Sequence, residues 1–387
     1  MLHGIPEVAA RLRQAREGAR LSPAIAAQAI GVPVTSLLAA EQGRGLTADL
    51  VWRAATAYGM SEEDLLEDDL ADSAVSILLK GDPEPDHLAL HIGRLASICR
   101  ERTILDALLG QPAQARVALF TPSEPTHPPY KQAEELAKAT RRTLGLGVAP
   151  IRSVSALMQE LGIRLVWTDR LRGDVQGLSL HDPKIGPSVV VNLRGKDEQW
   201  WMLRSILGHE LCHILYDRTP ARPLGIASRK DQRDDLEQRA NAFAIYFLAP
   251  RTGVANFFME RGRQPYNIDR SDLHALMMYY GIGKDSATWH LVNLGWITEL
   301  QRLALLEYRY PADQDGLESP LHQADLQPFI ERGVDCEHLM LVRSAVTAYE
   351  RGLISRGHLR EALGLSPFVS IDDLVEHPAG SHEHFDT

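Results

Sequence analysis

The stretch His209-Glu210-Leu211-Cys212-His213 constrains the fold and the chemistry of this chain more than any other. Two histidines four positions apart lie on one face of an α-helix, so both imidazoles can reach a single metal ion. Glu210 follows the first histidine, where its carboxylate can deprotonate a metal-bound water instead of binding the metal. Apolar residues on both sides of the motif place it in a buried helix. The spacing therefore predicts a helical zinc site, and a core helix with two hydrogen-bonded histidines is the alternative.

A third metal ligand is expected on a later helix, because catalytic zinc sites take three protein ligands and leave one position open. Residues 236–248 follow helical spacing, with acidic residues before them and a proline after them. Glu237 and Asn241 share one face of this helix, so they can supply a ligand and an amide that holds a ligand histidine in place. Asp234 and Asp235 compete for the ligand role, and a solvated helix start is the alternative for both.

A series of short motifs follows in a fixed order along residues 130–295: Gln132–Ala137, Gly162–Val166, Val189–Asn192, the histidine motif, Glu237-x-x-Ala240-Asn241-x-Phe243-Ala244, Leu248–Pro250, Leu276–Ile282 and Ser286–Gly295. Together they resemble the ImmA/IrrE metallopeptidases. This resemblance implies that Glu237 is the third ligand beside His209 and His213, as in gluzincin peptidases. The chain departs from the family pattern at Cys212, where Gly is common, and at His290, where Arg is more usual. Neither departure removes a matched metal ligand.

The first 67 residues show a second pattern, a series of short helical segments. Ser22-Pro23 has the residues of a helix start, and Gly31-Val32-Pro33 separates that helix from a third one. The third helix is expected to begin at Val34 and to end before Gly43. This pattern resembles the Cro/cI-type helix-turn-helix, in which the helix that starts near Val34 lies in the major groove of DNA.

The charge of this segment argues against sequence-specific binding of duplex DNA by a single copy. Six arginines and no lysine against eight acidic residues give residues 1–67 a net charge of −2. The expected recognition helix offers Thr35, Ser36 and Glu41, and none of these side chains can read a base edge in a bidentate manner. DNA contact and reuse of the helix-turn-helix for dimerisation or docking are therefore two open alternatives.

The predicted fold class is α+β and mainly helical. It comprises a zincin peptidase core of the gluzincin type with a small sheet, flanked by an N-terminal helix-turn-helix and C-terminal helical domains. The length of 387 residues suits two or three domains. The predicted boundaries are residues 1–67 for the helix-turn-helix domain, 68–125 for a helical connector, 126–265 for the zinc metallopeptidase domain, 266–375 for a C-terminal helical accessory domain and 376–387 for a flexible tail.

Cys99 lies in the connector, on one helical stripe with Leu88, Ile92 and Leu95. A packed core cysteine is the first interpretation of this stripe. The second is a cysteine switch, in which a thiolate from a segment before the peptidase fills the open zinc position and keeps the enzyme latent. Cys99 is therefore also a candidate inhibitory zinc ligand.

Composition places the chain in a broad class. A net charge of −10 argues against a protein that coats nucleic acid in general. Three cysteines, at positions 99, 212 and 336, do not form a disulfide framework, which favours a reducing cytoplasm. No basic-then-apolar leader and no run of about 18 apolar residues is present, so neither export nor a membrane partner is expected.

Three strands are expected between residues 163 and 193, at 163–167, 175–181 and 188–193. The last of them directly precedes the histidine helix. The resemblance implies that it borders the cleft, where it could pair with an extended substrate by strand addition. An interior strand without a substrate role is the alternative.

The motifs and the resemblance together imply a cytoplasmic zinc metalloendopeptidase. His209, His213 and Glu237 would bind one Zn²⁺ per chain, and Glu210 would take a proton from water and deliver it to the leaving amine. Asn241 is the candidate that orients a ligand. An additional donor for the oxyanion is expected among the following side chains: Tyr216, Tyr246, Tyr279, Tyr280 and His290.

The substrate follows from the resemblance alone. Family members cut helix-turn-helix repressors and so switch on stress, defence or mobile-element genes, often after DNA damage. A repressor is therefore the expected partner, with single-stranded DNA as a candidate activator and a homodimer as a candidate assembly. The competing hypothesis is a non-enzymatic helix-turn-helix transcription regulator with a sensor-like peptidase domain. A zinc-stabilised scaffold is the third hypothesis.

Overall fold

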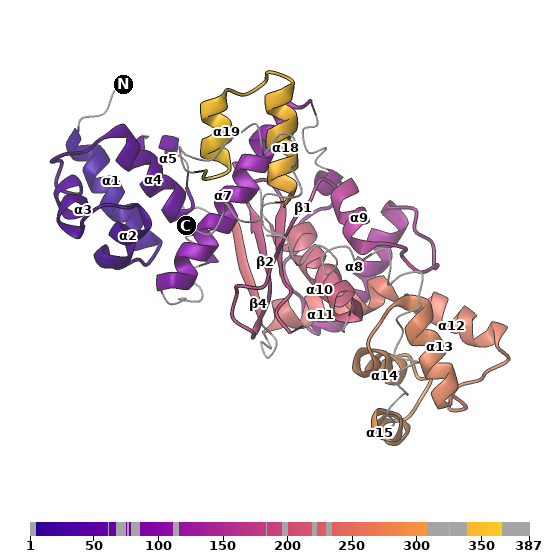
Figure 1. Cartoon of the computed structure of the whole chain (residues 1–387). Coiled ribbons are helices and arrows are strands. Elements are labelled where there is room, and N and C mark those ends of the chain that lie inside the picture. Colours follow the sequence, from indigo (N-terminus) through magenta and orange to yellow (C-terminus); the bar gives the residue numbers. More distant parts are fainter. Residues whose placement is uncertain are drawn as a thin grey trace.

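A computed structural model describes residues 5–60, 62–66, 75, 77–78, 86–110, 116–182, 184–195, 200–218, 223–229, 234–307, 325 and 339–365. Helices predominate, and one small sheet lies at the centre of the molecule (Figure 1). The N-terminal helices lie at one end of the view, and helices α12 to α15, within residues 251–307, lie at the other. The predicted α+β, mainly helical fold class is confirmed. The predicted tail, 376–387, lies outside the described residues.

The N-terminal part is a bundle of short helices. The side chain of Ser22 accepts a hydrogen bond from the backbone N–H of Ile25 and so caps the second helix, as the Ser-Pro pair predicts. Glu41 forms a buried ion pair with Arg16, at 2.6 Å between Oε1 and Nε. This pair removes Glu41 from the side chains that could read a base edge. The helices are α1 (Ile5–Gly18), α2 (Pro23–Ala29), α3 (Val34–Ala40), α4 (Ala48–Tyr58) and α5 (Glu62–Leu66).

The predicted connector contains a long helix, α7 (Asp86–Leu108), that joins this bundle to the sheet. The helix packs closely on the end of α4, because a Cβ on Gly93 would lie 2.7 Å from the carbonyl oxygen of Ala57. Arg100 donates a hydrogen bond to the carbonyl oxygen of Gly59 at 2.7 Å. A short 3₁₀ turn, η1 (Arg116–Leu119), follows. Helix α7 is thus part of the core that the N-terminal bundle shares with the sheet, whereas Val117 and Phe120 belong to the core on the other face.

The sheet has the strand order β1-β3-β2-β4. β1 and β3 are parallel, and β2 pairs antiparallel with both β3 and β4. β3 therefore has a hydrogen-bonded neighbour on each side. The predicted addition of a substrate strand to residues 188–193 is wrong, and the alternative of an interior strand is correct, because β1 and β4 form the two edges of the sheet. The strands are β1 (Arg164–Thr168), β2 (Val175–His181), β3 (Ser188–Asn192) and β4 (Leu224–Arg229).

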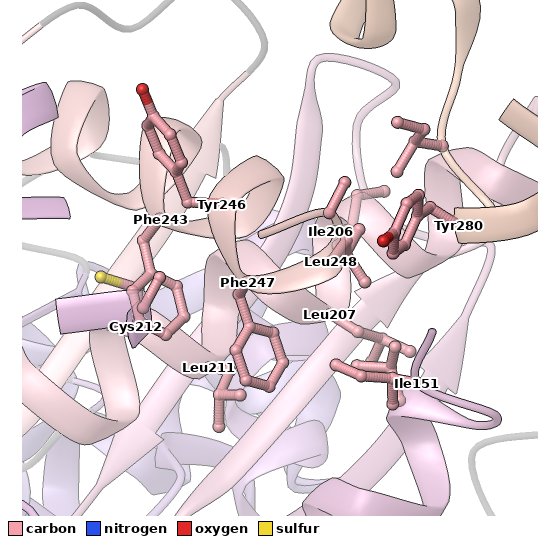
Figure 2. Close-up of a cluster of buried hydrophobic side chains, with 14 of the residues drawn as sticks. Ile151, Ile206, Leu207, Leu211, Cys212, Phe243, Tyr246, Phe247, Leu248 and Tyr280 are labelled. Atoms are coloured by element: carbon pink, nitrogen blue, oxygen red, sulfur yellow. The ribbon is translucent and has the colours of Figure 1, made fainter. Parts of the chain in front are cut away.

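Helices cover both faces of the sheet, because side chains alternate between the faces along each strand. Val189 and Val191 of β3 pack in one hydrophobic core with Leu207 of α10, whereas Val190 packs in the other with α7. Figure 2 shows part of the core that contains Val189 and Val191, where α10 packs against α11 (Asp235–Leu248). The helices of this region are α8 (Pro129–Thr143), α9 (Val154–Glu160), α10 (Trp200–Cys212), the π-helical turn η2 (His213–Asp217) and α11 (Asp235–Leu248).

Cys99 belongs to the α7 side of the sheet. Its side chain is fully buried in the same core as Ile92, Leu95 and Val190, and burial raises the pKa of its thiol. The histidine helix α10 packs on the opposite face, so the sheet separates Cys99 from His209. The predicted inhibitory contact is not formed in this structure, and the helical stripe of Cys99 is a packing surface.

The helices predicted as one C-terminal domain, 266–375, lie in two places (Figure 1). α13 to α15 extend the core that contains α10 and α11, whereas α18 packs on α7. Apolar periodicity predicts each helix but does not say which core it joins. The helices that follow α11 in the chain are α12 (Arg251–Glu260), α13 (Arg270–Tyr280), α14 (Lys284–Asn293), α15 (Glu299–Glu307), α18 (Leu339–Glu350) and α19 (Arg356–Ala362).

No single helix among the described residues is long and apolar enough to cross a membrane, and only the bent pair α2 and α3, at 100°, passes on length and composition.

Candidate metal centre

The histidine motif lies where α10 passes into η2. His209 belongs to α10, and His213 begins the π-helical turn, a distortion that is frequent at functional sites. Gly208 packs against α11, since a Cβ at this position would lie 3.3 Å from the Cα of Ala244. Leu211 and Cys212 of α10 lie near Phe243 of α11 in the adjoining core (Figure 2). The close approach of the two helices brings the first turns of α11 to the histidines.

Three predicted ligands meet between these helices. The Nε2 atoms of His209 and His213 are 3.0 Å apart, and oxygens of Glu237 lie 3.1 Å and 3.4 Å from them. All three side chains are buried, with donor atoms within 4.8 Å of one another. The competing carboxylates are exposed at the start of α11, where Asp234 accepts a hydrogen bond from the backbone N–H of Glu237. Among the described residues, neither Asp234 nor Asp235 joins the group.

Each histidine ring is oriented by an acceptor at Nδ1. Nδ1 of His209 lies 3.0 Å from Oδ1 of Asn241, and Nδ1 of His213 lies 2.6 Å from a carboxylate oxygen of Asp217. Because both partners accept, the protons of the neutral rings lie on Nδ1, and the Nε2 lone pairs point into the centre. Arg239 pairs with Asp217 behind the ring. Sequence reasoning found Asn241 but missed Asp217, whose position four residues after His213 was the available signal.

This arrangement requires a positive charge at its centre. With both Nε2 atoms unprotonated, the two oxygens of Glu237 are buried and have no hydrogen-bond partner in the part of the chain that the structure describes. Burial opposes a charge on His213, but its contacts with Asp217 and Glu237 outweigh burial and raise its pKa to about 10. Burial also raises the pKa of Glu237, but the two histidines outweigh that effect and lower it to about 2. A proton or a metal cation satisfies this demand, and two imidazoles with one carboxylate form a donor set that Zn²⁺ prefers.

Glu210 lies beside this group with its carboxylate turned toward β2. The side chain is fully buried. Its Oε2 accepts a hydrogen bond from the hydroxyl of Ser179 at 2.6 Å, whereas its Oε1 is buried with no hydrogen-bond partner among the described residues. One carboxylate oxygen is thus anchored, and the other lies against the backbone of Gly177 on β2. Ser179 was not identified from the sequence, because its contact with Glu210 joins residues 31 positions apart.

An open cleft of about 1000 Å³ runs between α10, α11 and α14 and reaches His209. Apolar side chains form much of its walls, with Trp201 from α10, Ile245 from α11 and Trp289 from α14. Gln176 of β2 lines the cleft together with His209. The cleft therefore offers a polypeptide a path to the metal-binding group.

The predicted oxyanion donors are largely engaged elsewhere. The hydroxyl groups of Tyr216 and Tyr280 are hydrogen-bonded to other protein oxygens within the core. His290 lines the cleft, but its Nε2 donates to a backbone carbonyl at 2.7 Å, and burial lowers its pKa to about 4. Tyr246 and Tyr279 are not among the described residues that line the cleft. The geometry therefore singles out none of the five.

Replacing Asn241 with alanine is expected to weaken zinc binding about 10- to 100-fold, since residues that orient ligand histidines contribute that much to metal affinity. The reason is that the ring of His209 loses the acceptor that orients it at Nδ1. Competition with a chromophoric chelator measures the affinity. Asn293→Ala is the matched control, because Asn293 lines the same cleft from α14. Equal zinc affinity for Asn241→Ala and the wild type would contradict the orienting role.

Two family models match the chain. Residues 7–67 match a helix-turn-helix domain, and residues 158–288 match the IrrE N-terminal-like domain of a peptidase family. The second span includes α10 and α11, and with them every residue of the metal-binding group. No curated protein and no solved structure matches the chain. The family models thus confirm the resemblance that the motifs carry, namely an N-terminal helix-turn-helix domain followed by an IrrE-like peptidase domain.

Proposed function

We propose that the protein is a zinc-dependent endopeptidase that cleaves a helix-turn-helix repressor. The observation that carries this proposal is the buried group of His209, His213 and Glu237 next to the buried carboxylate of Glu210. The match of residues 158–288 to a peptidase family supports it. In this proposal the first three side chains hold one Zn²⁺, and Glu210 is the catalytic residue.

The metal ion and the side chains around it have different roles in the proposed reaction. Bound Zn²⁺ supplies Lewis-acid polarisation of the scissile carbonyl and a lower pKa for water at the site. Glu210 accepts a proton from water at Oε1 and delivers it to the leaving amine, as a positioned general acid–base does. Asn241 and Asp217 keep the two imidazoles in the tautomer that leaves Nε2 free for the metal.

The substrate is proposed to bind in the cleft that reaches His209, where Trp289 provides an apolar platform. The indole is 44 % exposed, and the guanidinium of Arg302 stacks on it with its Cζ 3.8 Å from the ring centroid. Arg302 is itself fixed by hydrogen bonds to both carboxylate oxygens of Glu299. The ring is therefore held in place before a substrate arrives, which reduces the ordering cost of binding.

Truncating this platform is expected to raise KM about 10- to 30-fold with little change in kcat. Trp289→Ala removes a large contact surface, and truncating a central tryptophan of an interface costs about 2 kcal/mol or more. The effect falls on KM because Trp289 lies on the wall formed by α14 rather than in the metal-binding group. Initial rates of cleavage over a range of substrate concentrations separate the two constants.

Tyr279→Ala is the matched control for this measurement. Tyr279 is an aromatic side chain of similar exposure, 46 %, on α13, and it is not among the described residues that line the cleft. It should leave KM unchanged. A KM for Trp289→Ala equal to that of Tyr279→Ala would place the substrate outside this part of the cleft.

The function is tested by direct cleavage. Purified protein is loaded with zinc, its zinc content per chain is measured, and it is incubated with helix-turn-helix proteins encoded beside its gene. Intact-mass spectrometry should find one repressor converted into two fragments, and removal of zinc with a chelator should stop the conversion. Addition of single-stranded DNA then tests the proposed activating signal. Zinc-loaded protein that cuts no neighbouring repressor under either condition would count against the proposal.

A second function, DNA-binding transcription regulation without proteolysis, is favoured by the match of residues 7–67 to a helix-turn-helix domain. The exposed face of α3 bears Val34 and Leu38 at 37 % and 39 % exposure, beside Thr35 and Ser36. Such a face has few groups for reading bases and suits protein docking better. Fluorescence anisotropy with DNA from the gene's own promoter, at stated salt, distinguishes the two functions: saturable specific binding without cleavage supports the regulator.

A further inference from the structure

The carboxylate of Glu210 is held from the sheet side by β2. The hydroxyl of Ser179 donates to Oε2 at 2.6 Å, and both side chains are fully buried. A short hydrogen bond to a charged group, away from solvent, is among the stronger kinds in proteins. It fixes the torsion angle about the carboxyl group and so determines where the second oxygen, Oε1, points.

Gly177, two residues earlier on β2, closes the space around the other oxygen. A Cβ at this position would lie 2.5 Å from Oε1 and 2.9 Å from Cδ of Glu210. Real Cβ atoms do not approach other atoms so closely, so any larger residue here would push the Glu210 carboxylate out of its present position. The carboxylate is thus confined on two sides, by a hydrogen bond at one oxygen and by backbone at the other.

A β-bulge sets up this confinement. The pairing of β2 with β4 passes from Val175↔Arg229 directly to Gly177↔Ser228, which leaves Gln176 as an extra residue on β2. Bulges bend a strand and redirect its side chains, and they occur often beside active sites. Gln176 here lines the cleft with His209, while the next residue contacts Glu210.

We infer that Ser179 is a positioning residue: by anchoring Oε2 it keeps Oε1 of Glu210 oriented for proton transfer. The inference rests on the proposed peptidase function, because it assigns the anchored carboxylate the role of general base. Ser179 touches neither the substrate nor the metal ligands in this role and acts through Glu210 alone. Without the anchor, the carboxylate samples other orientations, and misplacement of a catalytic group by about 1 Å can cost about 100-fold in rate.

The test compares three zinc-loaded variants on the repressor found by the cleavage experiment. Ser179→Ala removes the anchor, and its kcat is expected to fall about 10- to 100-fold with KM within about twofold of the wild type. Ser179→Thr keeps a hydroxyl at the same position and should recover most of the rate. Ser188→Ala is the matched control, since Ser188 is a fully buried serine on the neighbouring strand β3, in a segment that contacts α7.

Four results would overturn the inference. They are an unchanged kcat in Ser179→Ala, a Ser179→Thr variant as slow as Ser179→Ala, an equal loss in Ser188→Ala, and loss of zinc or folding in Ser179→Ala alone. If the wild type cleaves nothing, the peptidase function fails separately, and the positioning role is then tested by crystal structures. These should show the Glu210 carboxylate displaced in Ser179→Ala and unmoved in Ser188→Ala, and an unmoved carboxylate in Ser179→Ala overturns the inference.

Discussion

Glu210→Gln is expected to abolish repressor cleavage while each chain still binds one zinc ion. Glutamine has nearly the same shape as glutamate and keeps an oxygen that can accept the hydrogen bond from Ser179. Its amide cannot take up a proton at neutral pH, so the general acid–base contribution of about 10²- to 10⁴-fold is lost. Zinc content should not change, because Glu210 is not among the side chains of the metal-binding group. Intact-mass spectrometry of the repressor and elemental analysis of zinc give the two readouts.

Glu237→Gln is the informative comparison for this variant. It makes the same chemical change in a neighbouring buried carboxylate, but one that lies 3.1 Å from Nε2 of His209. Glu237→Gln should therefore lose zinc together with activity, whereas Glu210→Gln should lose activity alone. Full cleavage by zinc-loaded Glu210→Gln would refute the mechanism, and zinc loss in both variants would assign Glu210 to the metal site.

Much of the metal-binding group could be predicted because its geometry is local to two helices. The spacing of His209 and His213 places both rings on one helical face whatever the rest of the chain does. The same rule placed Glu237 and Asn241 on one face of the next helix. The structure also decides between Glu237 and Asp234 as the third candidate ligand, because Asp234 caps the helix and lies outside the group of His209, His213 and Glu237.

The residues that the sequence did not reveal act across long separations. Ser179 and Gly177 reach Glu210 from a strand, and the bulge that aims them depends on pairing with β4, which follows the histidine motif in the chain. Cys99 illustrates the same limit through a contact that was predicted but is not formed. Its helical stripe indicates a buried face, but periodicity does not tell which side of the sheet that face covers. Local patterns thus predict helices, strands and their buried faces, whereas contacts between these elements can be identified only once the three-dimensional fold is known.

The link between the C-terminal part and the histidine helix is another such contact. Arg204 of α10 and Asp325 form a fully buried ion pair, with Nη1 and Oδ2 2.5 Å apart. Asp325 also accepts hydrogen bonds from the hydroxyls of Ser153 and Ser155, both at 2.8 Å, at the start of α9. Burial lowers the pKa of Arg204, and the charge of Asp325 opposes that effect only in part. The carboxylate of Asp325, a residue between α15 and α18 in the sequence, is therefore bonded to both α9 and α10.

Asp325→Ala is expected to destabilise the protein by about 3–5 kcal/mol, the usual cost of leaving one partner of a buried ion pair without its counter-charge. Arg204→Met combined with Asp325→Ala removes both charges and should cost less than the single change, because no uncompensated charge stays in the core. Urea unfolding of the zinc-loaded variants measures both. Glu17→Ala, which breaks the exposed Arg13–Glu17 pair, is the control and should change stability far less. Two results would contradict this role of the Arg204–Asp325 pair. They are a loss of unfolding free energy in Asp325→Ala no larger than in Glu17→Ala, and a larger loss in the double variant than in Asp325→Ala.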